Sequence, residues 1–263
     1  MTIQIGIVLL LNFVITLIGT LAYSVRLVGV KTGRVAVSFA LFNILALVSR
    51  TANTLQVPLL TKYVERNPFP SKLVGLFDLI ILTAVIASIV GAFLIPFFQR
   101  IFHKAVEAFS VNRSVPKLVL HSFSKSGVKY LKDSMKIPSK LNLGVFNLRK
   151  LPFKIMLLNT VSVTLLTVGA LAPIYAGSLE PELRATCITL SSILNGFAVI
   201  VMSVFIDPHL SILTDDVIDG KCSLAEFNNC VAGMVLTKIV GTVLSFAVLV
   251  PSAHLIVIVA RFI

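Results

Sequence analysis

The stretch VAVSFALFNILALVSRTANTLQVPLL, residues 35–60, decides the fold class of this chain. Its apolar side chains extend over more than the ~20 residues that an α-helix needs to cross the hydrocarbon core of a bilayer. Within it, SRTANTLQVP (residues 49–58) places an arginine and several uncharged hydrogen-bonding side chains where hydrocarbon is expected. The stretch therefore predicts a membrane-spanning helix with a polar patch near its middle.

Five further apolar stretches predict an all-α polytopic membrane protein with six transmembrane helices. The 263 residues are 57% hydrophobic and 13% charged, with a mean hydropathy of +0.98. A soluble domain of this length needs more charge to cover its surface, and open sheet edges cannot face lipid. We predict a single transmembrane domain, residues 1–263. Its helices are expected at about 3–24, 35–62, 73–99, 154–176, 185–206 and 231–260.

The basic residues of the connections predict the orientation in the membrane. Residues 100–154 hold twelve basic and two acidic residues, and so carry +10 of the formal net charge of +12. Lys and Arg concentrate in cytoplasmic connections. We therefore predict that the large basic connection between helices 3 and 4, residues 100–153, is cytoplasmic. The first connection, with Arg26, Lys31 and Arg34, shares that side, and both termini lie outside the bacterial plasma membrane.

Part of this connection has an amphipathic pattern. The segment KLVLHSFSKSGVKYLKD (117–133) mixes apolar residues with regularly spaced lysines. Such a segment can lie on the inner leaflet, with its lysines at anionic headgroups. The alternative is a solvated loop that only fixes the topology. Anionic membrane lipids are thus expected partners. Nucleic acid is not, because no RNA- or DNA-binding motif accompanies the charge.

Arg50 is the strongest candidate for a functional side chain. It lies about 22 Å from the inner end and about 18 Å from the outer end of its predicted helix, at 1.5 Å per residue. An arginine near a helix centre costs about 2.5–3.5 kcal/mol on insertion scales, so it requires a partner or a watery cavity. Helical spacing places Asn43 and Asn53 on the same side, with Gln56 more lateral. A guanidinium in such a cavity suits phosphate oxygens.

Two other ionisable residues lie in predicted spans. Asp78, about 9 Å from the outer end of the third helix, is either the ion-pair partner of Arg50 or an interfacial residue. Lys238 is a second cavity cation if the last helix begins near Ala225, and a snorkelling residue at the inner interface if the span begins at residue 239. The predicted substrate-binding residues are Arg50, Asn53, Gln56, Asn43, Asp78 and Lys238.

The C-terminal third of the chain carries two local signals. Asp207 and Pro208 predict the start of a short cytoplasmic helix, with Asp207 as its cap, and Gly220 suits the end of that helix. Small residues also recur at every fourth position of the last helix: Gly233, Thr237, Gly241 and Ser245. This pattern is typical of close helix association, and it is a candidate surface for a homodimer.

Motifs for catalysis or metal binding are not found. The cysteines, Cys187, Cys222 and Cys230, fit no metal-ligand spacing and are expected to be free thiols. The four histidines do not cluster, and there is no H-E-x-x-H, G-x-S-x-G or P-loop pattern. We expect neither an enzyme nor a cofactor.

Two stretches of the chain resemble the Amj family of alternate lipid II flippases. They are SFALFNILALVSRTANTLQVPLL (38–60) and FIDPHLSILTDDVIDGK (205–221), and the length, the six spans and the basic third connection are also similar. The resemblance covers the whole chain. It implies translocation of an undecaprenyl-pyrophosphate-linked peptidoglycan precursor from the inner to the outer leaflet. It supplies no catalytic residues, so the residues named above follow from the sequence alone.

Two other functions stay open. One is an ion-coupled transporter of a small solute that uses Arg50 and Asp78. The other is a membrane adaptor that recruits partners through residues 100–154 without transport. A flippase would give the headgroup a hydrated, partly cationic path and leave the lipid tail in the bilayer. Six helices make a small enclosure for such a headgroup, so a homodimer is also expected.

Overall fold

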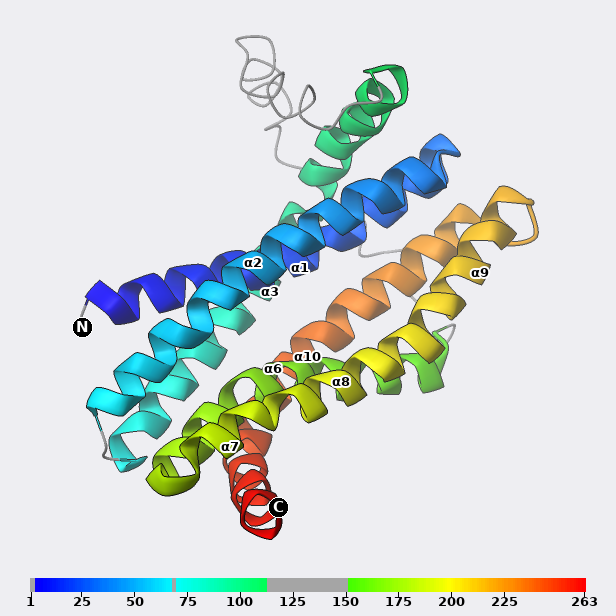
Figure 1. Cartoon of the computed structure of the whole chain (residues 1–263). Coiled ribbons are helices and arrows are strands. Elements are labelled where there is room, and N and C mark those ends of the chain that lie inside the picture. Colours follow the sequence, from blue (N-terminus) through cyan, green and yellow to red (C-terminus); the bar gives the residue numbers. More distant parts are fainter. Residues whose placement is uncertain (1–2, 68–69, 113–150) are drawn as a thin grey trace.

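The computed structural model describes residues 3–67, 70–112 and 151–263. This part of the chain contains helices and no strand, and six of its helical segments are long and apolar enough to cross a membrane (Figure 1). The prediction of an all-α membrane protein with six spans is confirmed. The helices are α1 (Ile3–Thr32), α2 (Val35–Arg66), α3 (Pro70–Asn112), α6 (Phe153–Leu179), the 3-10 turn η3 (Pro181–Leu183), α7 (Arg184–Thr189), α8 (Ser191–Val201), the π-helical turn η4 (Met202–Ile206), α9 (Asp207–Ile218) and α10 (Leu224–Phe262).

Most of the helices extend beyond the apolar runs that predicted them. Helix α1 continues to Thr32, so the basic residues Arg26 and Lys31 belong to a helix and not to the first connection. Helix α3 continues to Asn112, into the predicted connection 100–153. The reason is that hydropathy marks only the part of a helix that fits the hydrocarbon, while backbone hydrogen bonds carry the helix further. The predicted amphipathic segment 117–133 lies outside the described residues.

The fifth span is a broken helix that runs on into α9. Pro208 has no N–H, and its ring crowds the carbonyl four residues earlier, which disrupts an α-helix. The π-helical turn η4 precedes it, and the N–H of Asp207 bonds to the carbonyl of Met202. Because the helix does not restart at Asp207, the Asp207 side chain makes no cap, and that prediction is wrong. Gly220, at φ 73°, does follow the end of α9 as predicted.

The six spans form two halves, α1–α3 and α6–α10, and the two halves pack in the same order. In the first half, α1 packs along both α2 and α3, which touch each other far less. In the second half, α6 packs along both α8 and α10. Each half has three spans, an odd number, so corresponding helices cross the membrane in opposite directions. Transporters with inverted-topology halves share this alternation, and their sites form where the halves meet.

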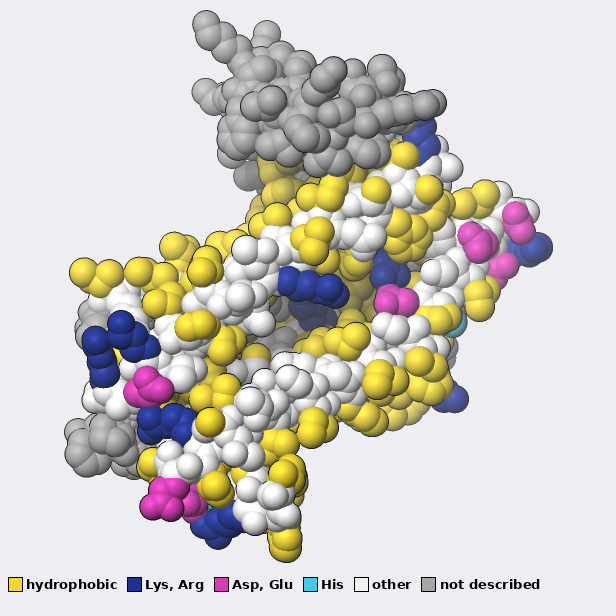
Figure 2. Space-filling view, viewed as in Figure 1, with side chains coloured by type: hydrophobic (Ala, Val, Ile, Leu, Met, Phe, Trp, Pro, Cys, Tyr) yellow, Lys and Arg dark blue, Asp and Glu magenta, His cyan; other side chains and the backbone are white. Residues whose placement is uncertain are grey.

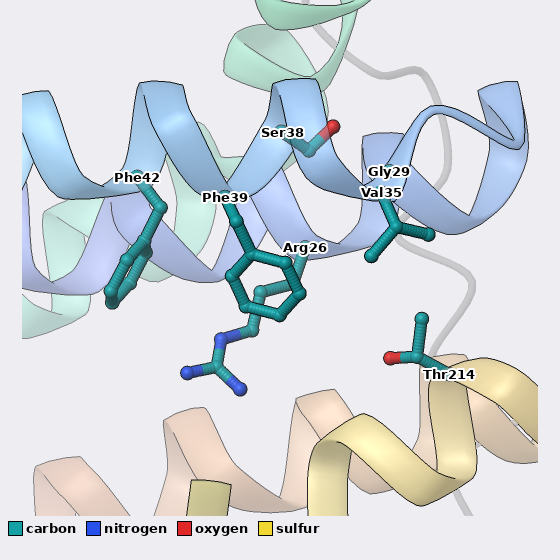
Figure 3. A pocket seen from close by; sticks show the side chains of 7 residues that line it. All are labelled: Arg26, Gly29, Val35, Ser38, Phe39, Phe42 and Thr214. Carbon is teal, nitrogen blue, oxygen red and sulfur yellow. The ribbon is translucent and has the colours of Figure 1, made fainter.

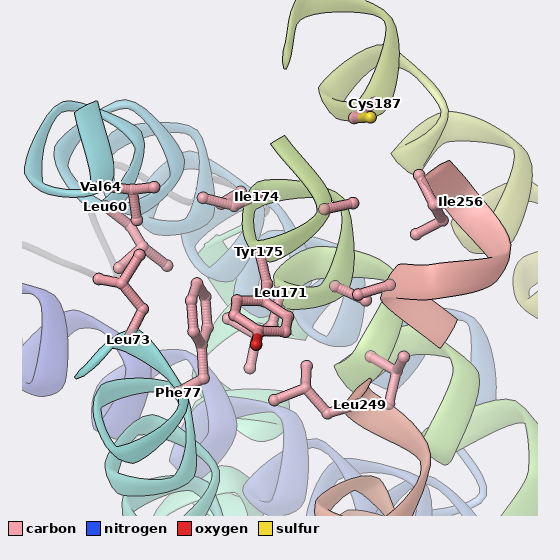
Figure 4. Packing of buried hydrophobic residues seen from close by; sticks show 14 of the residues in the cluster. Leu60, Val64, Leu73, Phe77, Leu171, Ile174, Tyr175, Cys187, Leu249 and Ile256 are labelled. Atoms are coloured by element: carbon pink, nitrogen blue, oxygen red, sulfur yellow. The ribbon is translucent and has the colours of Figure 1, made fainter. Parts of the chain in front are cut away.

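A large apolar cluster joins the halves at one end of the molecule (Figure 4). Leu60 of α2 and Phe77 of α3 are buried there against Tyr175 of α6 and Leu249 of α10. The rings of Phe77 and Tyr175 meet edge to face, with their centroids 5.6 Å apart. Burying several large side chains at about 25 cal/mol per Å² makes this the firmest contact between the halves.

The small-residue stripe of α10 packs against α6. A side chain at Gly241 would approach the carbonyl of Thr160 to 2.6 Å, and the hydroxyl of Thr164 donates to the Gly241 carbonyl at 2.9 Å. Ser245 is fully buried as well. The prediction of close helix packing is therefore confirmed. The stripe is covered within one chain, so it does not form the surface of a homodimer.

Replacing Gly241 by alanine should destabilise the protein. The added methyl group meets backbone at 2.6 Å, and overpacking of this kind costs typically about 1–3 kcal/mol. We expect a lower melting temperature of the detergent-solubilised protein. Gly196→Ala is the matched control, because no described atom would lie within 4 Å of a side chain at that position. Equal melting temperatures for the two variants would mean that α6 and α10 are not held at this spacing.

Candidate functional site

Gln56 belongs to a network of polar side chains that joins the three helices of the first half. Its side chain is 5% exposed, and its amide nitrogen donates to the Asn12 side-chain oxygen at 3.3 Å. Asn12 in turn donates to the carbonyl of Ile80 at 2.8 Å. The network therefore connects α2, α1 and α3. Gln56 is satisfied by this network and does not face a cavity.

Arg50, by contrast, lies on the exposed face of α2. Its guanidinium makes no ion pair or hydrogen bond with any residue that the structure describes. Asn43 and Asn53 are exposed on the same helix. The neighbouring Ser49 donates to the carbonyl of Ile15 at 3.4 Å, which fixes the level of this turn relative to α1.

Asp78 does not neutralise Arg50. Arg50 lies six residues, or about 9 Å, inward of Gln56 along α2. Asp78 lies on the other side of that level, two residues before Ile80 on α3. Helices α2 and α3 also touch little, because α1 packs along both. The depth mismatch is too large for the arginine side chain to bridge, and Asp78 is half-buried without an ion-pair partner among the described residues.

Lys238 lies well inside the last span. A capping box of Ser223 and Glu226 starts α10 at Leu224, which places Lys238 fourteen residues, or about 21 Å, along the helix. This start favours the prediction of a cation within the bundle over that of a snorkelling residue at the inner interface. Its ammonium donates to the carbonyl of Thr16 on α1 at 3.4 Å. A side chain at Gly19 would lie 3.0 Å from that ammonium, so the glycine keeps the space open.

Arg50 and Lys238 thus lie on helices that meet α1 at the same level. Ser49, next to Arg50, reaches Ile15, and Lys238 reaches Thr16. Neither cation has a carboxylate within ion-pair distance in the described part of the chain. Figure 2 shows a hollow between α2 and the α8–α9 segment, with Lys and Arg side chains along it. We call Arg50 and Lys238 the central cations, and the hollow the groove between the halves.

A third cation, Arg26, bridges the halves nearer one end of the groove. It lies on α1 ten residues after Thr16 and pairs with Asp207 of α9 at 2.6 Å. Sequence reasoning assigned Arg26 to a connection and Asp207 to a helix cap, so it missed this pair. Spacing offered a signal, because Thr16, Gly19, Tyr23 and Arg26 recur on one face of a continued helix.

Comparison with known proteins decides the family. The family described as "Alternate to MurJ", Amj, matches residues 11–260. A relative from Bacillus subtilis (strain 168), "Lipid II flippase Amj", is 32% identical over 244 residues, which cover 91% of this chain and 90% of the relative. This chain belongs to the Amj family. No solved structure matches it.

The resemblance to Amj seen in the sequence is therefore confirmed. What the described part of this Amj-family chain offers chemically is a set of cations on helices. The described residues contain no group of His, Cys, Asp or Glu side chains that could hold a metal ion. Its three cysteines are free thiols, as predicted. Unpaired cations inside a membrane protein suit the binding of an anion, and guanidinium suits phosphate.

Proposed function

We propose that this protein is a lipid II flippase that moves an undecaprenyl-pyrophosphate-linked peptidoglycan precursor from the inner to the outer leaflet. The proposal rests on membership of the Amj family, whose curated relative bears that name. The observation that carries the mechanism is the pair of central cations, which have no carboxylate partner among the described residues. The pyrophosphate is the anion that they would bind while the tail stays in lipid.

The mechanism that we propose is transport by alternating exposure, without a chemical step. Arg50 offers a planar guanidinium to the phosphate oxygens, and Lys238 offers a point charge from the opposite helix. Asn43 and Asn53, exposed on α2, offer hydrogen bonds to the sugar and peptide parts of the headgroup. Asp78 remains in the proposal as a residue of the outer part of the path. Gln56 acts only through the network that holds α2 against α1.

The proposal also includes the orientation of the protein in the membrane and its partners. The protein would lie in the bacterial plasma membrane with both termini outside, because Arg26, Lys31 and Arg34 lie around the junction of α1 and α2 and twelve basic residues lie in residues 100–154. The basic connection would attract anionic lipids, the precursor among them. A homodimer would enlarge the enclosure, through a face other than the covered stripe of α10.

The proposed function can be tested by the growth of a bacterial strain that depends on this protein for lipid II translocation. The chain, expressed alone in a strain that lacks its own lipid II flippases, should restore growth and make lipid II accessible outside the cell. Growth without accessible lipid II, or flux of a soluble solute into liposomes without lipid movement, would contradict the proposal. In that case an adaptor or a solute transporter would explain the chain better.

Cys222 offers a separate test of the orientation. It lies between α9 and α10 and is partly exposed, whereas Cys187 and Cys230 are buried. Burial and a hydrogen bond from its Sγ to Glu226 Oε2, at 3.3 Å, raise the pKa of the Cys222 thiol above its usual value. The reactive thiolate is therefore scarce at pH 7 and increases as the pH rises.

An impermeant maleimide should label Cys222 in inside-out vesicles and not in intact cells, and faster at pH 9 than at pH 7. Glu226→Gln should speed labelling at pH 7, because it removes the carboxylate and keeps a residue that completes a capping box. Labelling of Cys222 in intact cells would reverse the orientation that we propose.

A further inference from the structure

Arg26 is a nearly buried cation whose ion-pair partner, Asp207, is much more exposed to solvent. Its side chain is 11% exposed, while that of Asp207 is 46% exposed. A nearly buried arginine requires an anion close by, because leaving its charge unpaired is costly. A half-exposed carboxylate has the alternative of hydration. Of the two groups, Asp207 is the one that can be exchanged.

Two aromatic rings fix the Arg26 guanidinium in place. Its carbon lies 5.1 Å from the ring centroid of Phe42 and 5.7 Å from that of Phe39, both on α2. Cations are attracted to the faces of such rings. Figure 3 shows Arg26 and these rings on the wall of a small pocket, with Thr214 of α9 across from them. The guanidinium is thus held independently of Asp207 and faces a space between α2 and α9.

The segment that carries Asp207 contains an interruption of the regular helix. Asp207 follows the π-helical turn η4 and precedes Pro208, where the ordinary helix ladder is interrupted. Such interruptions are common places for helices to bend. Helix α9 therefore has a natural joint at the residue that pairs with α1.

We propose that Arg26 is the first binding site for the pyrophosphate of the lipid-linked substrate, and that Asp207 occupies its place until the substrate arrives. This inference rests on the proposed function. Arg26 lies ten residues from Thr16, which is about 15 Å along the axis of α1 from the level of the central cations. In the proposed orientation it lies on the cytoplasmic side of them. A pyrophosphate bound by Arg26 would next meet Arg50 and Lys238.

The exchange links binding to movement of the halves. The pair Arg26–Asp207 connects α1 of the first half with α9 of the second. When a phosphate oxygen replaces Asp207 as the partner of the Arg26 guanidinium, the Asp207 carboxylate becomes hydrated and this connection is lost. A ligand that binds only the separated state shifts the equilibrium toward it. Substrate binding would thus leave this end joined by the apolar cluster of Leu27 and Val30 with Phe227 and Val231, while the larger cluster of Figure 4 holds the other end.

The experiment measures binding of purified lipid II to the full chain in detergent micelles. Arg26→Gln should weaken binding by about tenfold, the effect of one lost charged contact. Asp207→Asn should tighten binding, because it removes the competing anion. The double variant Arg26→Gln, Asp207→Asn removes both charges together, so it leaves no lone buried charge, and it should bind as weakly as Arg26→Gln. Lys31→Ala, an exposed charge on the same helix, is the control.

Several results would overturn this inference. If Asp207→Asn weakens binding as much as Arg26→Gln does, the pair is only a structural contact. The same follows if the charge-reversed pair Arg26→Asp, Asp207→Arg binds like the wild type.

Inorganic pyrophosphate and vesicles of phosphatidylglycerol serve as separate probes. If either depends on Arg26 more strongly than lipid II does, the site serves free anions or general lipids. If the Arg26 variants support growth and bind lipid II as the wild type does, this inference is contradicted and the proposed function is not affected.

Discussion

Replacing Arg50 by alanine should abolish growth in a strain that depends on this protein for lipid II translocation, at a normal protein level. The guanidinium has no partner among the described residues, so its removal breaks no contact of the fold. What it removes is a charged contact with phosphate, worth about 1.5–3 kcal/mol. That range corresponds to about 10- to 100-fold in transport rate. The readouts are growth, external lipid II and protein amount in the membrane.

A matched control lies on the same helix. Lys62→Ala removes an exposed positive charge twelve residues further along α2, near its end, and should leave growth unchanged. Arg50→Lys should give an intermediate rate, because an ammonium keeps the charge and loses the planar fork. If Arg50→Ala supports growth like the wild type, Arg50 is not part of the transport path.

Lys238→Met should show opposite effects on stability and transport. Lys238 is partly buried inside a span, and its one described contact is the carbonyl of Thr16 at 3.4 Å. A charge in that position costs free energy that an apolar side chain of similar length does not. We expect the melting temperature in detergent to stay equal or to rise by about 2–4 °C for each kcal/mol gained. Transport should fall at least about tenfold, as for loss of one charged contact.

Such a trade-off distinguishes a functional residue from a structural one. Leu236→Met, at an exposed position two residues earlier on α10, is the control for introducing methionine and should change neither property. A Lys238→Met protein that melts at a lower temperature would show that the lysine is part of the packing between α10 and α1. Unchanged transport would remove Lys238 from the path.

The class of fold was predictable because a bilayer imposes strong limits on composition. Runs of about 20 apolar residues have few uses other than spanning it, and the sequence contains six of them. The ends of the helices were not predictable in the same way. Arg26 lies past the apolar run of α1, and the hydropathy that marks a span says nothing of how far the helix continues. Asp207 was misassigned for a related reason, because a π-helical turn has no clear sequence signature beyond the proline that follows it.

The candidate site was predictable only in part. The depth of Arg50 followed from counting residues along one helix, and the structure places it on an exposed face, with no ion pair to any described residue. The partners of Gln56 and Asp78 depend instead on how α1, α2 and α3 are arranged, which periodicity within one helix does not reveal. The role of Gln56 in joining three helices through Asn12 required the tertiary structure. The same holds for the shared level of Arg50 and Lys238 beside α1, since they are 188 positions apart in the chain.

The hydrogen-bonded amides of Gln56 and Asn12 also limit how this protein can change shape. In hydrocarbon there is no water to replace a broken hydrogen bond, so pulling α1 away from α2 or α3 would expose bare amide and carbonyl groups to lipid. We therefore expect the first three spans to travel as a rigid block during transport. The movement would then take place between the two halves, at the groove where Lys238 of α10 reaches α1, and the substrate would pass along that groove.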